Sequence, residues 1–431
     1  MGGMFQVLRN AWKIQDLRRK FIFTVLLLIV YRIGAHIPIP NLDPNEFRRL
    51  IEEFGGTLGG FLDIISGGAF KNVTIFAMSI TPYINSSIII QLLTVAIPSL
   101  ERLAKEGEEG RKILAQYTRY GAVILGFLQA AGLYWGMRSA VVGGPNVLNF
   151  ITITLTFTAG TAFLMWLGEK ITENGIGNGI SMIIFAGILS RGPQAVQLIF
   201  GLYEAKAFGE GIIGILVILL ILVIFVAVIA AVIWVQEAER RIPIQYAKRV
   251  VGRKMYGGQS THLPIKVNLS GVLPIIFAMS IMAFPSTLVT MFWPNSTSKI
   301  ALFFKNAQGT IWYALVYALL IIFFTFFYSV IQFNPVEIAN NMKKNGGFIP
   351  GLRPGKPTSD YIAKVLNRIT WFGGFFLAVV TLLPSILGSI FRVGGIWIGG
   401  TTVLILVGVA LETVKQVESQ MLMRHYKGFL E

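Results

Sequence analysis

Long apolar runs separated by short polar segments fill almost the whole chain. Each run is roughly 20 residues long, the length that an α-helix needs to cross a ~30 Å hydrocarbon core. The chain shows no pattern of period-two strands that would predict a membrane β-barrel. We therefore predict an all-α polytopic membrane protein with ten transmembrane helices, at residues 21–38, 72–97, 113–137, 149–168, 179–200, 211–235, 269–293, 310–333, 371–391 and 396–414.

The stretch Phe61–Thr94 departs from this simple pattern. A short apolar piece that contains Asp63 ends at the pair Gly67-Gly68, and a long apolar helix that carries Pro82 follows it. That helix also carries many polar residues, which are Ser79, Thr81, Tyr83, Asn85, Ser86, Ser87 and Gln91. Polar groups are costly in hydrocarbon without a partner. We therefore expect the helix to line a route across the membrane, with the short piece as its stopper.

The N-terminal residues 1–20 precede the first apolar run. Within them, residues 5–20 predict an amphipathic helix that lies in the membrane interface. Its apolar residues are Phe5, Leu8, Trp12 and Leu17, and its basic residues include Arg9, Lys13, Arg18 and Lys20. No small-residue cleavage site follows the first apolar run, so we expect an uncleaved first span rather than a signal peptide.

Basic residues outnumber acidic ones, 37 to 21, which gives a net charge of +16. In a soluble protein this excess would suggest a nucleic-acid partner, but here the basic residues concentrate in alternate loops, as the positive-inside rule describes. The loops 237–268 and 334–370 are the most basic. The first segment on the opposite side is an exception, because it carries Arg48, Arg49 and Lys71. This asymmetry places both termini in the cytoplasm. Loops of this length usually bind a ligand or another molecule.

The predicted spans divide into two sets of five near residue 205. We expect an N-terminal half at 21–205, a C-terminal half at 206–414 and a cytoplasmic tail at 415–431. Prolines interrupt the second span of each half, which are Pro82, Pro274 and Pro285. Interrupted helices at matching positions point to a repeat pair that flanks a central path.

Residues typical of catalysis or of cofactor binding are scarce. The chain has no cysteine, and its three histidines are dispersed, so we expect no metal site and no cofactor. The run Gly175–Gly179 resembles a phosphate loop but lacks the following lysine and a preceding strand, and a closely packed helix start explains it better. Acidic residues are almost missing from the spans, which disfavours ion-coupled transport and an ion filter. We expect a protein without enzymatic activity.

Two isoleucine pairs are spaced by one helical turn, Ile80 with Ile84 and Ile180 with Ile184, so each pair shares a helix face. If both pairs face inward, their branched side chains would form a dry constriction that stops water and ions and still yields to a peptide. Contact with lipid or with another helix is the alternative for either pair.

Four runs in the chain resemble the SecY family, the channel subunits of bacterial protein-translocation complexes. They are ITPYINSSIIIQLL at 80–93, GIGNGIS at 175–181, QSTHLPIKVN at 259–268 and PGLRPG at 350–355. The resemblance implies a channel of two five-helix halves. Such a channel translocates unfolded, signal-sequence-bearing preproteins and inserts transmembrane segments into the membrane lipids. The implied partners are the small subunits SecE and SecG, the SecA motor ATPase and the ribosome.

The resemblance also implies roles for individual residues. The implied pore ring is Ile80, Ile84, Ile180, Ile184, Ile276 and Ile405. The implied plug, at about 61–70, includes Phe61, Leu62, Asp63, Ile64, Ile65, Ser66, Gly67 and Gly68. A lateral gate between spans 2–3 and 7–8 would include Ser87, Gln91, Gln129 and Ser280.

The two long basic loops would dock the motor or the ribosome, through Arg353 together with Arg240, Arg241, Lys248 and Arg249. A turn residue that anchors lipid phosphates is the alternative for Arg353. Two further hypotheses concern the whole chain. A secondary transporter of small solutes would need midplane charges, which the spans lack. A docking platform whose spans conduct nothing would tolerate polar residues at the six isoleucines.

Overall fold

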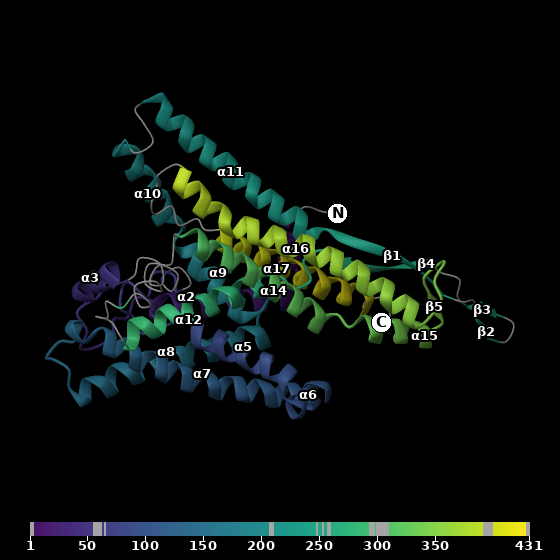
Figure 1. Ribbon diagram of the computed structural model, residues 1–431, viewed down its shortest axis with the longest axis horizontal. Coiled ribbons are helices and arrows are strands. Elements are labelled where there is room, and N and C mark those ends of the chain that lie inside the picture. Colours follow the sequence, from purple (N-terminus) through teal and green to yellow (C-terminus); the bar gives the residue numbers. More distant parts are fainter. Residues whose placement is uncertain are drawn as a thin grey trace. The chain divides into compact units, whose positions relative to one another are not determined.

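The computed structural model describes residues 4–54, 63, 66–206, 211–246, 249–251, 254–256, 260–292, 298, 310–390 and 400–427. The chain forms two compact units. The first comprises Met1–Gln197, Ser280–Gln308 and Val409–Glu431, and the second comprises Leu198–Met279 and Gly309–Gly408. Figure 1 labels their helices and strands in chain order. The predicted division into halves near residue 205 stays a prediction.

The first unit is built mainly of helices from the N-terminal part of the chain (Figure 1). These are α1 Met4–Lys13, α2 Gln15–Gly34, α3 Pro44–Phe54, α5 Thr81–Ala96, α6 Pro98–Lys105, α7 Glu108–Gly136, the 3-10 helix η1 Arg138–Ala140, α8 Val147–Asn174 and α9 Gly179–Ser190. The helix α10 Gly192–Glu204 follows α9 after Arg191. Helix α7 packs against α5 and α8, and α9 packs against α8.

Small residues let the helices of the first unit approach closely. A Cβ atom on Gly160 would collide with the carbonyl of Ile75, and one on Gly179 with the carbonyl of Gly168. Helix α9 begins at Gly179 because the side chain of Asn178 accepts hydrogen bonds from the N–H groups of Ile180 and Ser181. The run Gly175–Gly179 is therefore a closely packed helix start, as predicted.

The predicted span 72–97 is helical only from Thr81. Residues 71–80 form turns, because Ile39 N–H donates to the carbonyl of Val73 and Ile75 N–H donates to the carbonyl of Ile37. Pro82 lies in the first turn of α5, where its missing N–H costs nothing, so the prediction that it interrupts the helix is wrong.

One predicted span is broken in two, and the helices α6 and α3 lie outside the predicted spans. Between α5 and α6 the direction changes by 103°, since Ile97 precedes Pro98 and is held extended. The predicted span 179–200 consists of α9 and α10 in succession. In addition, the helix α3 lies in the segment between the first two predicted spans, where no helix was predicted.

The second unit combines helices with a small antiparallel sheet. Its helices are α11 Ile212–Glu237, the first part of α12 Leu273–Phe292, α14 Ile311–Gln332, α15 Pro335–Lys344, α16 Lys356–Ile390 and the first part of α17 Gly400–Lys427. Its strands are β1 Glu239–Tyr246, β2 Arg249–Val251, β3 Lys254–Tyr256, β4 Ser260–Lys266 and β5 Gly347–Phe348. Strands β4, β1 and β5 form one sheet in that order, and β2 pairs with β3.

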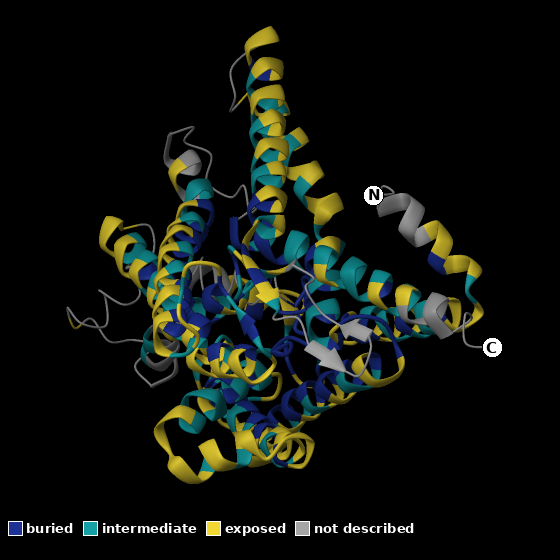
Figure 2. Ribbon diagram, turned by 90° about the vertical axis from the view of Figure 1, so that its right-hand side faces the viewer, coloured by how far each residue is buried: buried dark blue, intermediate teal, exposed yellow. Residues whose placement is uncertain are grey.

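Among the described residues, six helices are long and apolar enough to cross a membrane, or seven if the bent pair α5–α6 counts as one span. Exposed residues run along these helices (Figure 2). Helix α11 is the extreme case, with only Gly214, Val232 and Val235 buried within this apolar helix. Apolar surface on this scale needs lipid around it, so the chain is a multi-pass α-helical membrane protein. The number of ten spans stays a prediction.

Candidate functional site

The predicted plug is partly described: Asp63, Ser66, Gly67 and Gly68 lie within the described residues, whereas Phe61, Leu62, Ile64 and Ile65 lie outside them. We refer to Asp63 and residues 66–70 as the plug turn. Gly68 N–H donates to the carbonyl of Asp63 at 2.8 Å, and Phe70 N–H donates to Ser66 Oγ at 3.1 Å. Gly67 and Gly68 have φ of 65° and 89°, which favour glycine, so these bonds close a tight turn.

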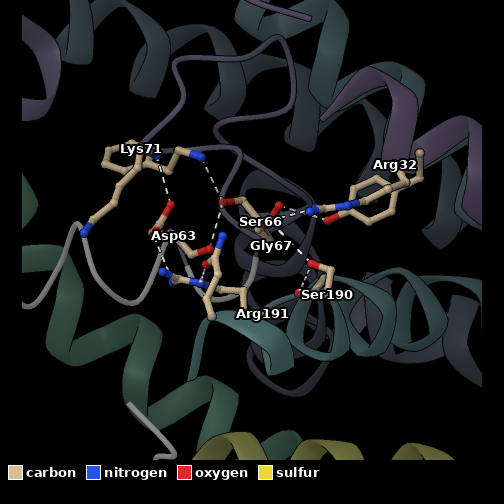
Figure 3. Close-up of polar contacts among 11 residues, drawn as sticks. Arg32, Asp63, Ser66, Gly67, Lys71, Ser190 and Arg191 are labelled. Atoms are coloured by element: carbon tan, nitrogen blue, oxygen red, sulfur yellow. Dashed lines mark hydrogen bonds and ion pairs between the residues drawn. The ribbon is translucent and has the colours of Figure 1, made fainter. Parts of the chain in front are cut away.

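Helix α2 holds the plug turn through two donors (Figure 3). Tyr31 Oη donates to the carbonyl of Ser66 at 3.0 Å, and Arg32 Nη1 donates to the carbonyl of Gly67 at 2.8 Å. The sequence pattern had assigned neither residue a role. The turn is therefore fixed to α2 at the carbonyls of two successive residues, of which the Ser66 carbonyl also accepts the N–H of Ala69 at 3.4 Å.

The end of α9 holds the plug turn from a second direction (Figure 3). Arg191, which follows α9, forms an ion pair with Asp63, with 2.8 Å between Nη1 and Oδ2. Ser190 Oγ donates to the carbonyl of Gly187 at 2.7 Å and lies 3.5 Å from the carbonyl of Gly67. A buried acid in an apolar segment signals that a cationic partner exists, but the sequence offers many cations and does not choose among them.

Three residues of the predicted pore ring belong to one hydrophobic cluster in the first unit. Ile80 is buried in this cluster, and Ile84 and Ile180 pack against it half-buried. Ala69 of the plug turn is a buried member of the same cluster. Ile184 lies one turn after Ile180 on α9 and is also buried. Ala69 of the plug turn therefore shares one buried cluster with three of the isoleucines that were predicted to close a route, and their role in a ring stays a prediction.

The other two predicted ring residues lie in the second unit. Ile276 is half-buried near the start of α12, and Ile405 is buried in the first part of α17. The units are described separately, so a ring of six isoleucines stays a prediction.

The four residues of the predicted lateral gate lie on three helices. On α5 the structure brings two together, with Gln91 Nε2 donating to Ser87 Oγ at 3.3 Å. Gln129 is half-buried on α7, the helix that packs against α5. Ser280 is half-buried on α12. A gate formed by these residues stays a prediction.

The two long basic loops fold together, which the sequence reading missed. Strand β1 from the first loop pairs with β4 from the same loop and with β5 from the second. One buried core joins them, made of Ile242, Ile244, Ile265, Met342, Ile349, Ile362 and Leu366. We call this assembly of 239–266 and 335–369 the loop domain. Its core shows that the predicted docking surface is built on a folded support rather than on two separate loops.

Four of the five predicted partner-binding residues lie within the described residues, and all four belong to this loop domain. Arg353 is exposed in the turn before α16, and its carbonyl accepts a hydrogen bond from the buried Thr358 Oγ1 at 2.8 Å. Arg240 and Arg241 are exposed on β1, and Arg241 forms an ion pair with Glu239 at 2.6 Å. Arg249 lies in β2, and Lys248 lies outside the described residues. Arg353 thus has a fixed backbone and an exposed guanidinium.

A search of the described part of the chain finds no group of three or more His, Asp or Glu side chains that could hold a metal ion. The polar groups of the plug turn bind one another and the helices around it.

Comparisons with known proteins agree with this geometry. The sequence model of the SecY family matches residues 74–414. The protein translocase subunit SecY of Halalkalibacterium halodurans is 48% identical over 437 residues, which cover 99% of this chain and 100% of that protein. The fold is similar to a solved SecY structure described as having a plug domain that stabilises the closed state of the translocation channel (TM-score 0.61, 20% identity, 94% of this chain and 93% of that one). It is also similar to Sec61 in the canine ribosome-channel complex (TM-score 0.55, 18% identity, 94% and 93%).

Proposed function

The chain belongs to the SecY family, and from this premise we propose that it is the central subunit of a protein-conducting channel. This channel moves unfolded preproteins across the cytoplasmic membrane and inserts transmembrane segments into it. The observation that carries the proposal is the similarity to a protein translocase subunit along 99% of the chain. The buried cluster that contains both Ala69 of the plug turn and Ile80 supports it.

The seal is made by packing rather than by charge. Ala69 and Ile80 share one buried cluster, and branched apolar side chains exclude water and ions from a narrow passage. A preprotein chain displaces the plug turn and passes between the isoleucines. Apolar side chains form no hydrogen bonds with the passing peptide, so the constriction grips any sequence weakly.

The lateral gate sorts the segments that pass. An apolar segment of about 20 residues gains several kcal/mol by entering lipid, whereas one central Lys or Asp opposes entry by about 3 kcal/mol. The Ser87–Gln91 contact on α5 lies within a span whose polar side chains need partners when the gate closes. Opening at this helix exposes each segment to lipid, and its hydrophobicity decides whether it stays there.

The energy for transport comes from partners, because the channel itself hydrolyses nothing. SecA or the ribosome docks on the loop domain, where Arg240, Arg241 and Arg353 are exposed. The small subunits SecE and SecG complete the complex in the membrane. The basic loop domain and both termini face the cytoplasm, in agreement with the charge distribution along the chain.

Reconstitution tests this function. Proteoliposomes that contain the chain with SecE- and SecG-type subunits should, with SecA and ATP, protect a preprotein from added protease. Vesicles that lack only this chain serve as the control. Protection of equal extent in both preparations would refute the proposal.

A further inference from the structure

The carboxyl group of Asp63 is fully buried. A carboxylate that leaves water needs an opposite charge and hydrogen-bond donors in place of its water. Lys71 N–H donates to Oδ1 at 2.9 Å. Arg191 Nη1 lies 2.8 Å from Oδ2 and forms an ion pair with it, and Oδ2 has no hydrogen-bond donor among the described residues. Lys71 follows Asp63 closely along the chain, so it moves with the plug turn. Arg191 provides the opposite charge from a different element.

Arg191 is held in place independently of the plug turn. It follows the last residue of α9 with helical φ and ψ, and its N–H donates to the carbonyls of Ile188 and Leu189. Its carbonyl accepts the N–H of Ala195 at 3.0 Å, so Arg191 is also tied to the start of α10. Arg191 Nε also donates to Gln194 Oε1 at 3.4 Å. The guanidinium therefore stays with α9 when the plug turn moves.

The backbone fit between the two elements brings Asp63 within reach of Arg191. A Cβ atom on Gly67 would lie 2.9 Å from both Cα and O of Gly187 and 2.9 Å from Ser190 Oγ. Only a glycine permits this approach, and its φ of 65° turns the chain back toward Asp63. The close contact and the ion pair thus fix the same turn against the same end of α9 (Figure 3).

The contacts from α2 are of a different kind. Tyr31 and Arg32 donate to the carbonyls of Ser66 and Gly67, which any sequence of the turn would offer. The Asp63–Arg191 pair instead joins two side-chain charges, and the two are unequally buried. The Arg191 side chain is 24% exposed and the Asp63 side chain 0%. Without its partner, Arg191 keeps contact with water, but the carboxylate of Asp63 lacks an opposite charge for as long as the plug turn keeps its seat.

From these contacts we infer that Arg191 is a positioning residue, which holds the plug turn in its seat through Asp63. Loss of the ion pair releases the turn while α9 and the rest of the first unit stay folded. The consequence for transport rests on the proposed function, because only in a channel does the seated turn close a passage. The position of the turn itself can be measured without transport.

The test uses the absence of cysteine from the chain. Ala69, which is fully buried in the cluster with Ile80, is replaced by Cys in the full chain with its companion subunits in proteoliposomes. The rate of labelling by a membrane-impermeant maleimide then reports release of the plug turn. Arg191→Gln should speed labelling at least about tenfold, because it leaves the buried carboxylate of Asp63 unpaired. Asp63→Asn also breaks the pair but should speed labelling less, because Arg191 keeps contact with water. Arg191→Lys, which keeps the charge, should restore most of the protection.

Controls separate this effect from misfolding. Arg138→Gln removes another arginine, one that contacts the Trp135 ring, and should leave the labelling rate unchanged. The double variant Asp63→Asn/Arg191→Gln should label no faster than the faster single variant, since both changes break one contact. Unchanged labelling in both single variants, or a double effect equal to the product of the single effects, would overturn the inference.

Transport measured on the same vesicles keeps the two proposals apart. Faster labelling in the variants of a chain that moves no preprotein would support the role of Arg191 and refute the channel function. A chain that transports preprotein, with labelling unaffected by either variant, would support the channel and refute the role of Arg191.

Discussion

Gly67 and Gly187 touch so closely that a Cβ atom on Gly67 would lie 2.9 Å from the Cα of Gly187. The two residues belong to the plug turn and to α9. Gly68, the next residue along the chain, also has positive φ, but a Cβ atom on it would meet nothing within 4 Å. Substitutions at these two neighbouring glycines therefore separate the effect of backbone conformation from the effect of close packing.

Gly67→Ala should loosen the seal more than Gly68→Ala does. A side chain at positive φ costs roughly 1–2 kcal/mol at either position, and overpacking adds about 1–3 kcal/mol at Gly67 alone. Ion conductance of the reconstituted channel in planar bilayers measures the difference. Equal conductance of the two variants would show that the contact with Gly187 does not hold the turn.

Ile84→Asn should raise ion conductance and admit preproteins with defective signal sequences. A polar side chain in the hydrophobic cluster around Ile80 holds water that the isoleucine excludes. Ile276→Asn should act in the same way if the predicted ring is correct. Ile84→Leu, which keeps the volume and the apolar character, is the control and should leave both properties close to normal. Unchanged conductance of the Asn variants would remove these residues from the ring.

Arg353→Glu should abolish SecA-driven transport without unfolding the chain. Its side chain is exposed, so the expected change in unfolding free energy is within about 0.5 kcal/mol. A rigid turn presents the guanidinium, which favours a directed contact with the motor. Lys356→Glu makes the same change of charge nearby and should reduce transport much less. Equal loss in both variants would point to a general attraction by charge, and normal transport by Arg353→Glu would exclude it from the partner site.

Ile244→Ala should destabilise the loop domain. The side chain is buried in the core that joins the two loops, and truncation of a buried isoleucine costs about 2–5 kcal/mol. Gln245→Ala changes the adjacent exposed residue and should have little effect. Limited proteolysis should cut the Ile244→Ala variant faster within 239–266, and SecA-driven transport should fall. Equal protease resistance of the two variants would contradict a shared core.

The positions of the helices were predictable from the sequence wherever a single local property determines them. A run of apolar residues has few alternatives to a membrane helix, so α8, α11 and α14 lie close to their predicted positions. The start of α5 did not follow, because Pro82 was interpreted as an interruption. Proline at the first helical positions is also a start signal, and the pairing of Ile39 with Val73 holds the preceding residues 71–80 in turns.

The sheet of the loop domain had a signal that was overlooked. Along β1 the buried Ile242 and Ile244 alternate with exposed Arg241, Pro243 and Gln245, which is the period of a half-buried strand. Basic residues and turn signals drew attention to the loops as binding segments instead. Pairing of β1 with β5 lies beyond any local pattern, since the two strands come from different loops.

The candidate site was predictable in its residue types and not in its contacts. Asp63 and the glycines of the plug turn stand out locally, and so do the isoleucine pairs. The partners Tyr31, Arg32 and Arg191 come from distant helices and were distinguished by nothing in the sequence. Long-range pairs of this kind depend on how helices pack, which no single segment encodes.

A crosslinking experiment that locates the path of the preprotein is the most direct test of the proposed channel. One Cys is placed at Ile84, and separately one at Leu320 on α14, in the chain that otherwise lacks cysteine. A preprotein with a single Cys is stalled in transit by SecA and ATP, and the vesicles are then oxidised. We predict a disulfide crosslink from position 84 and none from position 320. Continued transport of the preprotein without any crosslink at position 84 would contradict the account, because the path would then lie elsewhere.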